Sequence, residues 1–170
     1  MYQLSRLEYL TLGANSFGGP LPSEIGSLTL LRELSCEANA LTGFIPSELG
    51  NLQNLEELKL NENFLSSTIP NELGELPIFY LDVAGNNLEG NVGNLTFTTT
   101  RLHTLFLDDN FLTGTMPQQF CSVNVELSFD CSIDLCGCDC DCLTGKQMGG
   151  GDDTDDNIID VDEGEDDDSN

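Results

Sequence analysis

Apolar and polar residues alternate in short runs along the chain, and each run is followed by an asparagine. In the clearest run Leu58 and Leu60 flank Lys59, and Asn63 follows. The asparagines recur at steps of 24, 24, 23 and 24 residues, as Asn15, Asn39, Asn63, Asn86 and Asn110. A fixed period of this length is typical of a repeat protein, in which each repeat is one structural unit.

Each repeat is predicted to contain a β-strand, a turn and a return leg. Because side chains alternate between two faces of a strand, Leu34 should point inward and its neighbours outward. One repeat cannot bury its apolar side alone, so the strands must stack in a parallel sheet with a single core row: Leu10, Leu34, Leu58, Leu81 and Leu105. The asparagines should form a ladder, because an amide both donates to and accepts from backbone groups that the turn leaves buried.

Residues 41–50, Leu-Thr-Gly-Phe-Ile-Pro-Ser-Glu-Leu-Gly, resemble the plant-type leucine-rich repeat, whose consensus carries Leu-x-Gly-x-Ile-Pro and then a leucine and a glycine. The resemblance covers about residues 4–120. It implies an α/β solenoid, a right-handed leucine-rich-repeat superhelix with a concave parallel β-sheet and short 3-10 or loop return legs. It also implies a role in recognising other molecules, without indicating a particular ligand.

Three parts are predicted. Residues 1–120 hold about five repeats, residues 121–146 form a cysteine-rich C-terminal cap, and residues 147–170 form an acidic tail. The tail holds 11 acidic residues and no basic one, so it lacks the apolar surface that offsets the entropy of ordering and should be disordered. Because the first repeat begins almost at Met1, we expect the sequence to be the C-terminal part of a longer protein or to come from a gene model whose start is misplaced.

Individual repeats depart from the pattern. The third is one residue shorter and carries Ser67 in place of the usual glycine, which predicts a local irregularity in curvature. The fourth carries Gly93 where the pattern has proline, and it contains an N-glycosylation sequon at Asn94. Cys36 takes a position that is leucine or valine in the other repeats, which predicts a buried structural thiol.

Six further cysteines lie close together near the end of the repeats: Cys121, Cys131, Cys136, Cys138, Cys140 and Cys142. In one interpretation they form up to three disulfides, similar to the caps of extracellular leucine-rich repeat proteins, and Cys36 remains the one free thiol. In the other, the run from Cys136 to Cys142 binds a soft metal through thiolates. The spacing is not that of a zinc ribbon, which favours the disulfides.

Charge and missing motifs limit the possible functions. The formal charge is −25 at pH 7, which disfavours nucleic acid and anionic membrane surfaces, because both require clustered Lys and Arg. The sequence has no run of about 18 apolar residues of the kind that spans a membrane. It also has no signal segment, phosphate loop, nucleophile elbow or His-rich metal motif. We therefore predict a protein that is not an enzyme, with no cofactor, no metal site and no catalytic residue.

The outward side chains of the strands, with those just after them, form the candidate binding surface. Eight are predicted to bind the ligand: Tyr9, Glu33, Glu57, Lys59, Tyr80, Asp82, Phe106 and Asp108. The same face should carry Thr11, Ser35, Glu37, Asn61, Glu62, Thr104 and Asp109, all exposed to solvent. Aromatic residues among carboxylates favour a basic or amphipathic protein or peptide ligand centred on Tyr80 and Phe106.

The leading hypothesis is thus a protein or peptide recognition module of a receptor-like, defence or signalling type. An extracellular or cell-surface location is inferred from the cysteine cap and the family resemblance. Within the same family, an inhibitor of pathogen or wall enzymes is a rival interpretation. The alternative from another class is a structural protein of a matrix or wall, whose acidic tail would interact with calcium or mineral surfaces.

Overall fold

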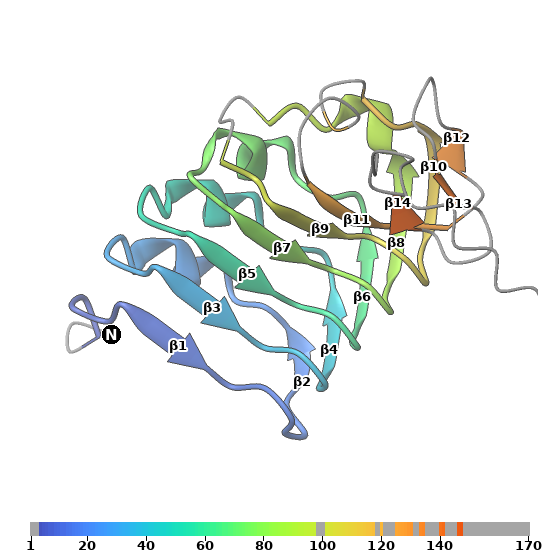
Figure 1. The fold of residues 1–170 in the computed structure, drawn as a ribbon. Helices are drawn as coiled ribbons and strands as arrows, with labels where there is room; N and C mark the ends of the chain where they lie inside the picture. Colours follow the sequence, from blue (N-terminus) through green and yellow to red (C-terminus); the bar gives the residue numbers. More distant parts are fainter. Residues whose placement is uncertain are drawn as a thin grey trace, which may run out of the picture.

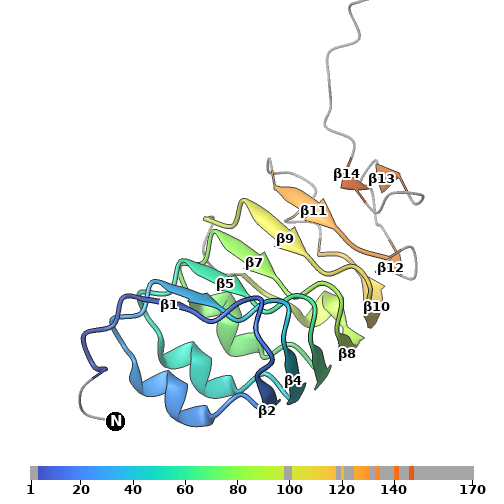
Figure 2. The same cartoon turned by 90° about the horizontal axis from the view of Figure 1, so that it is seen from below.

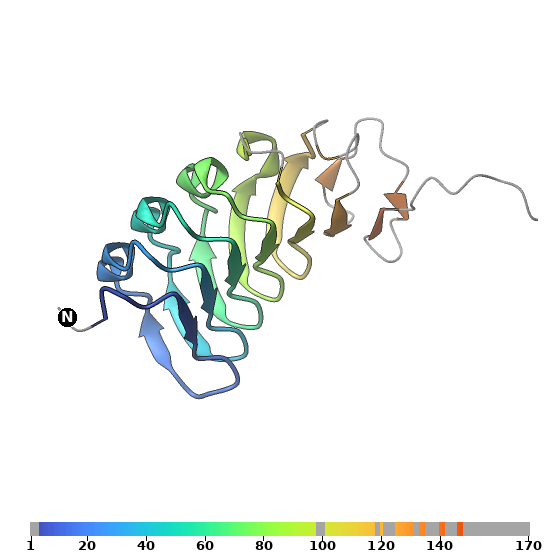
Figure 3. The same cartoon turned by 60° about the vertical axis from the view of Figure 1, so that its left-hand side comes forward.

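The computed structural model describes residues 4–97, 101–117, 120, 125–130, 133–134, 140–141 and 146–147, the last three pairs by their backbone alone. The chain winds into a stack of coils (Figure 1), and the strands of these coils build two sheets. Figure 3 shows successive coils side by side in sequence order. The return legs are 3-10 helices: η1 (Ser23–Ser27), η2 (Ser47–Asn51), η3 (Asn71–Glu75) and η4 (Val92–Asn94).

The first sheet is parallel through its first six strands. These are β1 (Tyr9–Thr11), β3 (Glu33–Ser35), β5 (Glu57–Lys59), β7 (Tyr80–Asp82), β9 (Thr104–Phe106) and β11 (Glu126–Ser128). The antiparallel strands β14 (Lys146–Gln147) and β13 (Cys140–Asp141) follow at its edge. The second sheet consists of β2 (Gly18–Pro20), β4 (Ala40–Gly43), β6 (Phe64–Ser67), β8 (Asn87–Asn91), β10 (Phe111–Thr115) and β12 (Ile133–Asp134). In Figure 2 the first sheet runs along one side of the stack and the 3-10 helices along another.

The predicted core row is confirmed by the pairing of the first sheet. Leu10, Leu34, Leu58, Leu81 and Leu105 are direct neighbours on adjacent strands, and Leu127 of β11 continues the row. All are buried except Leu10, which is only partly buried because a coil covers it on one side alone. Cys36 is buried in the same core, and burial raises the pKa of its thiol to about 11. It therefore stays protonated and occupies the structural position that was predicted.

The asparagine ladder is present, and four of its five members make the full set of hydrogen bonds. The amide of Asn63 donates to the carbonyls of Cys36, Leu60 and Asn61 at 3.0, 3.1 and 3.2 Å, and its Oδ1 accepts from the N–H of Leu41 at 3.0 Å. Three other members repeat this set of bonds: Asn39, Asn86 and Asn110. Each amide thus links its own turn to the coil before it, so the ladder stabilises stacking as well as the turn.

The residue before each ladder asparagine has a left-handed backbone. The φ values are between 50° and 64° for Ala14, Ala38, Glu62, Gly85 and Asp109. Only glycine adopts this conformation without a steric penalty from its Cβ, so four of the five turns retain some strain. The ladder's hydrogen bonds hold the chain in this conformation.

Asp130 closes the ladder at its C-terminal side. In earlier coils the N–H groups of Glu62 and Asn63 donate to backbone carbonyls of the next coil, at 2.9 and 3.1 Å. The corresponding N–H groups of Asp109 and Asn110 donate instead to the Asp130 carboxylate, at 3.1 and 3.2 Å. The side chain therefore supplies the acceptors that a further turn would supply.

The irregularity of the third repeat lies at Leu76 and not at Ser67. Ser67 keeps a φ of 70°, close to the 79° of Gly43, so the glycine-type conformation persists without glycine. Leu76 has a ψ of 155°, whereas the equivalent Leu52 has a ψ of 67°. Pro77 follows Leu76 and excludes a compact backbone there, and the extended step takes up the missing residue. The pairing of β5 with β7 is unchanged by it.

Several sequence predictions lie outside the described residues. These are the acidic tail from 148 onward and the side chains of the six clustered cysteines, of which only Cys140 is described, by its backbone in β13. The disulfide and metal interpretations of the cluster therefore both remain predictions. The division into repeats, cap and tail likewise stays a prediction beyond residue 130.

Candidate ligand-binding surface on the concave sheet

Two rows of side chains run across the first sheet, one on each side of the buried leucines. The rows are Tyr9, Glu33, Glu57, Tyr80, Thr104, Glu126 and Thr11, Ser35, Lys59, Asp82, Phe106, Ser128. We call these rows, with the following Glu37, Glu62, Asp108 and Asp109, the concave face. Neighbours within a row lie on strands about 4.8 Å apart, so their side chains touch or shield one another.

Lys59 is the cation at the centre of the concave face. Its Nζ lies 2.7 Å from Glu57 Oε2 and 3.4 Å from Glu33 Oε1. It also lies 5.2 Å from the centroid of the Tyr80 ring, within range of a cation–π interaction. The hydrogen bond with Glu57 is the main cause that raises the pKa of Lys59. The ammonium is therefore already engaged with Glu57 and Glu33, and it forms no ion pair with the other described carboxylates of this face.

The Tyr80 and Phe106 rings form a pair beside this group. Their centroids are 6.0 Å apart and their planes meet at 80°, the edge-to-face arrangement that aromatic pairs favour. Both rings are half-buried, so each presents one apolar side. Burial, followed by the Asp82 carboxylate, raises the pKa of the Tyr80 hydroxyl, which stays neutral.

Asp82 lies between Lys59 and Phe106 in its row and is 9% exposed. Burial, with smaller contributions from the nearby Asp108 and Glu62, raises the pKa of its carboxyl to about 6. A hydrogen bond of 3.1 Å from the Ala84 N–H partly opposes this rise. No cation of the described residues forms an ion pair with Asp82, Asp108 or Glu62. The cluster thus concentrates negative charge next to an apolar ring pair.

The prediction that all of this face is exposed is wrong for three of its short side chains. Ser35 is 2% exposed, and Asp82 and Thr104 are each 9% exposed. Each of the three is shorter than a neighbour in its row, and the longer side chain covers it across the strand spacing. Ser35 is held further by a short hydrogen bond from its hydroxyl to the Glu37 carboxylate.

The predicted site residues divide into one cluster and one outlier. Glu33, Glu57, Lys59 and Tyr80 make direct contacts, and Asp82, Phe106 and Asp108 adjoin them. Tyr9 is 59% exposed on β1, three strands away from Tyr80, or about 14 Å. Tyr9 therefore lies apart from the ring pair.

Exposed aromatic residues on the other side of the coils were missed by the sequence analysis. Phe44, Phe64 and Phe111 are more exposed than Tyr80 or Phe106, and they lie on or next to strands of the second sheet. Their signal in the sequence was a bulky apolar residue at a repeat position that is otherwise small or polar. The position of Phe64 and Phe111 is serine, alanine or asparagine in other repeats, and that of Phe44 is proline, threonine or asparagine. Asn94, the sequon residue, is exposed at the end of η4.

Comparison with protein-family profiles identifies the type of repeat. The profile described as Leucine Rich Repeat matches residues 6–28, 30–52, 54–76 and 101–123. The chain therefore belongs to the leucine-rich repeat family. The unmatched fourth repeat is the one that carries Gly93 in place of proline. Comparison with curated proteins gives no match.

Solved structures show that the repeats are of the plant type. Pollen Receptor Kinase 3 is similar with 30% identity and a TM-score of 0.72, over 80% of this chain and 66% of that one. The Arabidopsis receptor kinase HAESA, solved with the peptide hormone IDA and the co-receptor SERK1, is 31% identical with a TM-score of 0.68, over 75% and 23%. A plant ice-binding protein is 27% identical with a TM-score of 0.63, over 79% and 51%. The chain thus spans less than two thirds of these structures.

Two of these neighbours are described by different ligands, a peptide hormone and ice, although they share one fold. The fold alone therefore does not decide what a leucine-rich repeat chain binds. Among the described residues, no cluster of three or more metal-ligating side chains occurs. None of the helices in this part of the chain has the length and apolar character needed to cross a membrane.

Proposed function

We propose that this chain recognises a basic or amphipathic protein or peptide on its concave face, outside the cell or at its surface. The observation that carries the proposal is the Tyr80–Phe106 ring pair beside Asp82, Asp108 and Glu62, three carboxylates that form no ion pair with any cation of the described residues. A Lys or Arg of the ligand would neutralise this cluster while an adjacent apolar side chain covers the rings. The extracellular setting is supported by the likeness to plant receptor ectodomains and by the exposed sequon at Asn94.

Selection from a random peptide library displayed on phage tests this proposal. Selected peptides should combine Lys or Arg with apolar residues, and their affinity should decline with rising salt. Phe106→Ala should weaken binding by more than about 1 kcal/mol. Phe64→Ala is the matched control, because it removes an exposed phenylalanine from the other sheet. Peptides that bind equally well after Tyr80, Asp82 and Phe106 are all replaced by alanine would refute the assignment of the site.

A further inference from the structure

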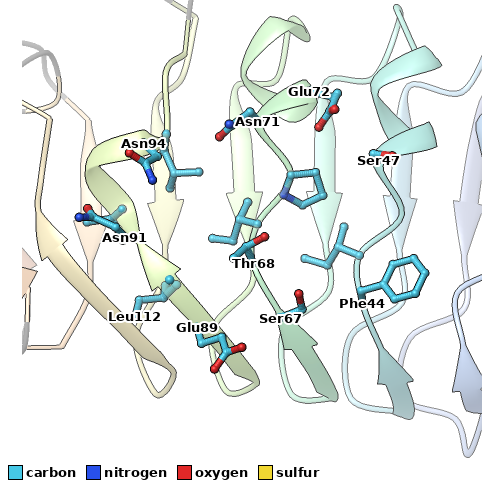
Figure 4. A pocket seen from close by; sticks show the side chains of 16 residues that line it. Phe44, Ser47, Ser67, Thr68, Asn71, Glu72, Glu89, Asn91, Asn94 and Leu112 are labelled. Carbon is cyan, nitrogen blue, oxygen red and sulfur yellow. The ribbon is translucent and has the colours of Figure 1, made fainter.

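A groove runs across the coils on the side opposite the concave face, and the inference drawn from it does not depend on the proposed function. It has a volume of about 410 Å³ and lies between the 3-10 helices and the second sheet (Figure 4). Two sets of equivalent repeat positions line it. One follows the left-handed glycine position of each repeat and contributes Phe44, Thr68 and Asn91. The other lies three residues further along each repeat and contributes Ser47 and Asn71, which begin η2 and η3, and Asn94, which ends η4.

The floor of this groove is apolar and its rim is polar. Buried Ile45, Ile69 and Val92 lie beneath it, and the exposed side chains of Glu72 and Glu89 stand at its edges (Figure 4). In the described part of the chain, no hydrogen bond engages the side chain of Thr68, Asn71 or Asn94, although that of Asn91 accepts from the Gly93 N–H at 2.7 Å. The lining thus offers unused hydroxyl and amide groups at regular intervals.

The ring of Phe44 stands out of the groove because of the residue beside it. In other repeats the equivalent side chain lies over the glycine of the next repeat, where an added Cβ would come within 2.8 Å of Thr68 at Gly90 and would overlap Asn91 at Gly114. At the position next to Phe44, the following repeat carries Ser67 and not glycine, and serine has a Cβ. The side chain of Phe44 therefore cannot lie over a glycine, and its ring is 62% exposed at one end of the groove.

The geometry points to a neutral, linear oligosaccharide as the ligand of this groove. The apolar floor and the Phe44 ring suit the C–H faces of sugar rings, and the amides, hydroxyls and carboxylates of the rim suit their hydroxyl groups. The coil spacing of about 4.8 Å is close to the length of one pyranose unit in an extended chain, so one ring lies over each coil. The lining holds two carboxylates and no cation, which disfavours phosphate, sulfate and uronate ligands.

A peptide fits this groove less well. The backbone of β4, β6 and β8 beneath it is already paired within the second sheet, so no free strand edge is available for an added peptide strand. The side chains of the rim also offer no deep apolar recess for an anchoring residue.

Ligand-observed NMR and calorimetry with a panel of neutral linear hexasaccharides, among them β-1,4-glucan and β-1,4-mannan, test the proposal on the full chain. At least one should bind, and an oligogalacturonate of equal length should bind more weakly. Phe44→Ala should reduce affinity about tenfold by removing the stacking platform. Thr68→Val, which removes one hydroxyl at constant shape, should reduce it several-fold.

Three controls separate this groove from its surroundings. Phe64→Ala removes a phenylalanine of similar exposure, 57%, that does not line the groove, and Phe106→Ala alters the concave face; neither should change saccharide binding. Thr96→Ala removes the sequon and keeps the Asn94 side chain, so binding should be retained or tighter. The inference is overturned if no neutral hexasaccharide binds, if binding survives both Phe44→Ala and Thr68→Val, if it is lost with Thr96→Ala, or if selected peptides depend on Phe44. Loss of peptide binding on Phe106→Ala alone would refute neither proposal.

Discussion

Replacing Asp82 by asparagine should stabilise the protein at neutral pH. The Asp82 carboxyl is 9% exposed, and burial raises its pKa to about 6 from an ordinary value of 3.8, with Asp108 and Glu62 adding to the rise. The native state therefore holds the proton of this group more tightly than the unfolded chain does. The stabilisation that results is fully present below about pH 4 and is lost as the pH rises through about 6.

The difference between a pKa of about 6 and one of 3.8 corresponds to about 3 kcal/mol. At pH 8 the parent protein bears this cost of a buried charge, whereas Asp82→Asn cannot ionise. The amide oxygen still accepts the hydrogen bond from the Ala84 N–H, so that contact is kept. The variant should therefore be more stable than the parent by up to about 3 kcal/mol at pH 8, which raises the melting temperature by about 5 to 10 °C. At pH 4 the two proteins should melt together.

Thermal unfolding followed by circular dichroism at both pH values measures this difference. Asp108→Asn is the matched control, because it removes a neighbouring carboxylate that is only half-buried, and its gain at pH 8 should be clearly smaller. Destabilisation of Asp82→Asn at pH 8, or an equal gain at both pH values, would refute the burial argument.

Five further substitutions test the core, the turns and the ladder by urea unfolding. Leu58→Ala, at a fully buried position, should cost about 2 to 5 kcal/mol, and an unchanged midpoint would mean that the core register is wrong. Ala38→Gly should stabilise by up to about 1 kcal/mol and Gly85→Ala should destabilise by a similar amount, because both positions have positive φ; changes of the same sign would contradict this reasoning. Asn63→Ala should cost at least about 2 kcal/mol because it leaves buried backbone groups unpaired, whereas Asn15→Ala, at an exposed position with two such bonds, should cost less.

The repeat period was sufficient to predict the strands, their parallel register and the asparagine ladder. Each of these features rests on contacts that recur in every coil, so a correct interpretation of one repeat applies to the others. Leu34 and Leu58 pair directly, as their equivalent positions require. The effect of one missing residue was harder to place, because the sequence showed the shorter repeat and Ser67 together, and only the backbone at Leu76 shows where the repeat departs from the others.

Exposure on the concave face could not be predicted from alternation. Alternation tells which side of a strand a residue faces, but the burial of Asp82 depends on the lengths of Lys59 and Phe106 on the adjacent strands. Lys59 and Phe106 are each more than 20 residues from Asp82 in the sequence, and only the stacking of the coils makes them its neighbours. The raised pKa of Asp82 follows from this crowding and has no signal in its own repeat.

The two proposed surfaces belong to the same repeats and yet are chemically independent. In the third coil, Lys59 faces the concave side while Thr68 lines the groove, and the buried Leu58 and Leu65 lie in the core between them. Because the core leucines carry the stacking, residues of either surface can change without disturbing the other. The concave face carries carboxylates around an aromatic pair, and the groove carries amides and hydroxyls near Phe44. Together the two proposals predict that a charged ligand and a neutral one can bind to the solenoid at the same time.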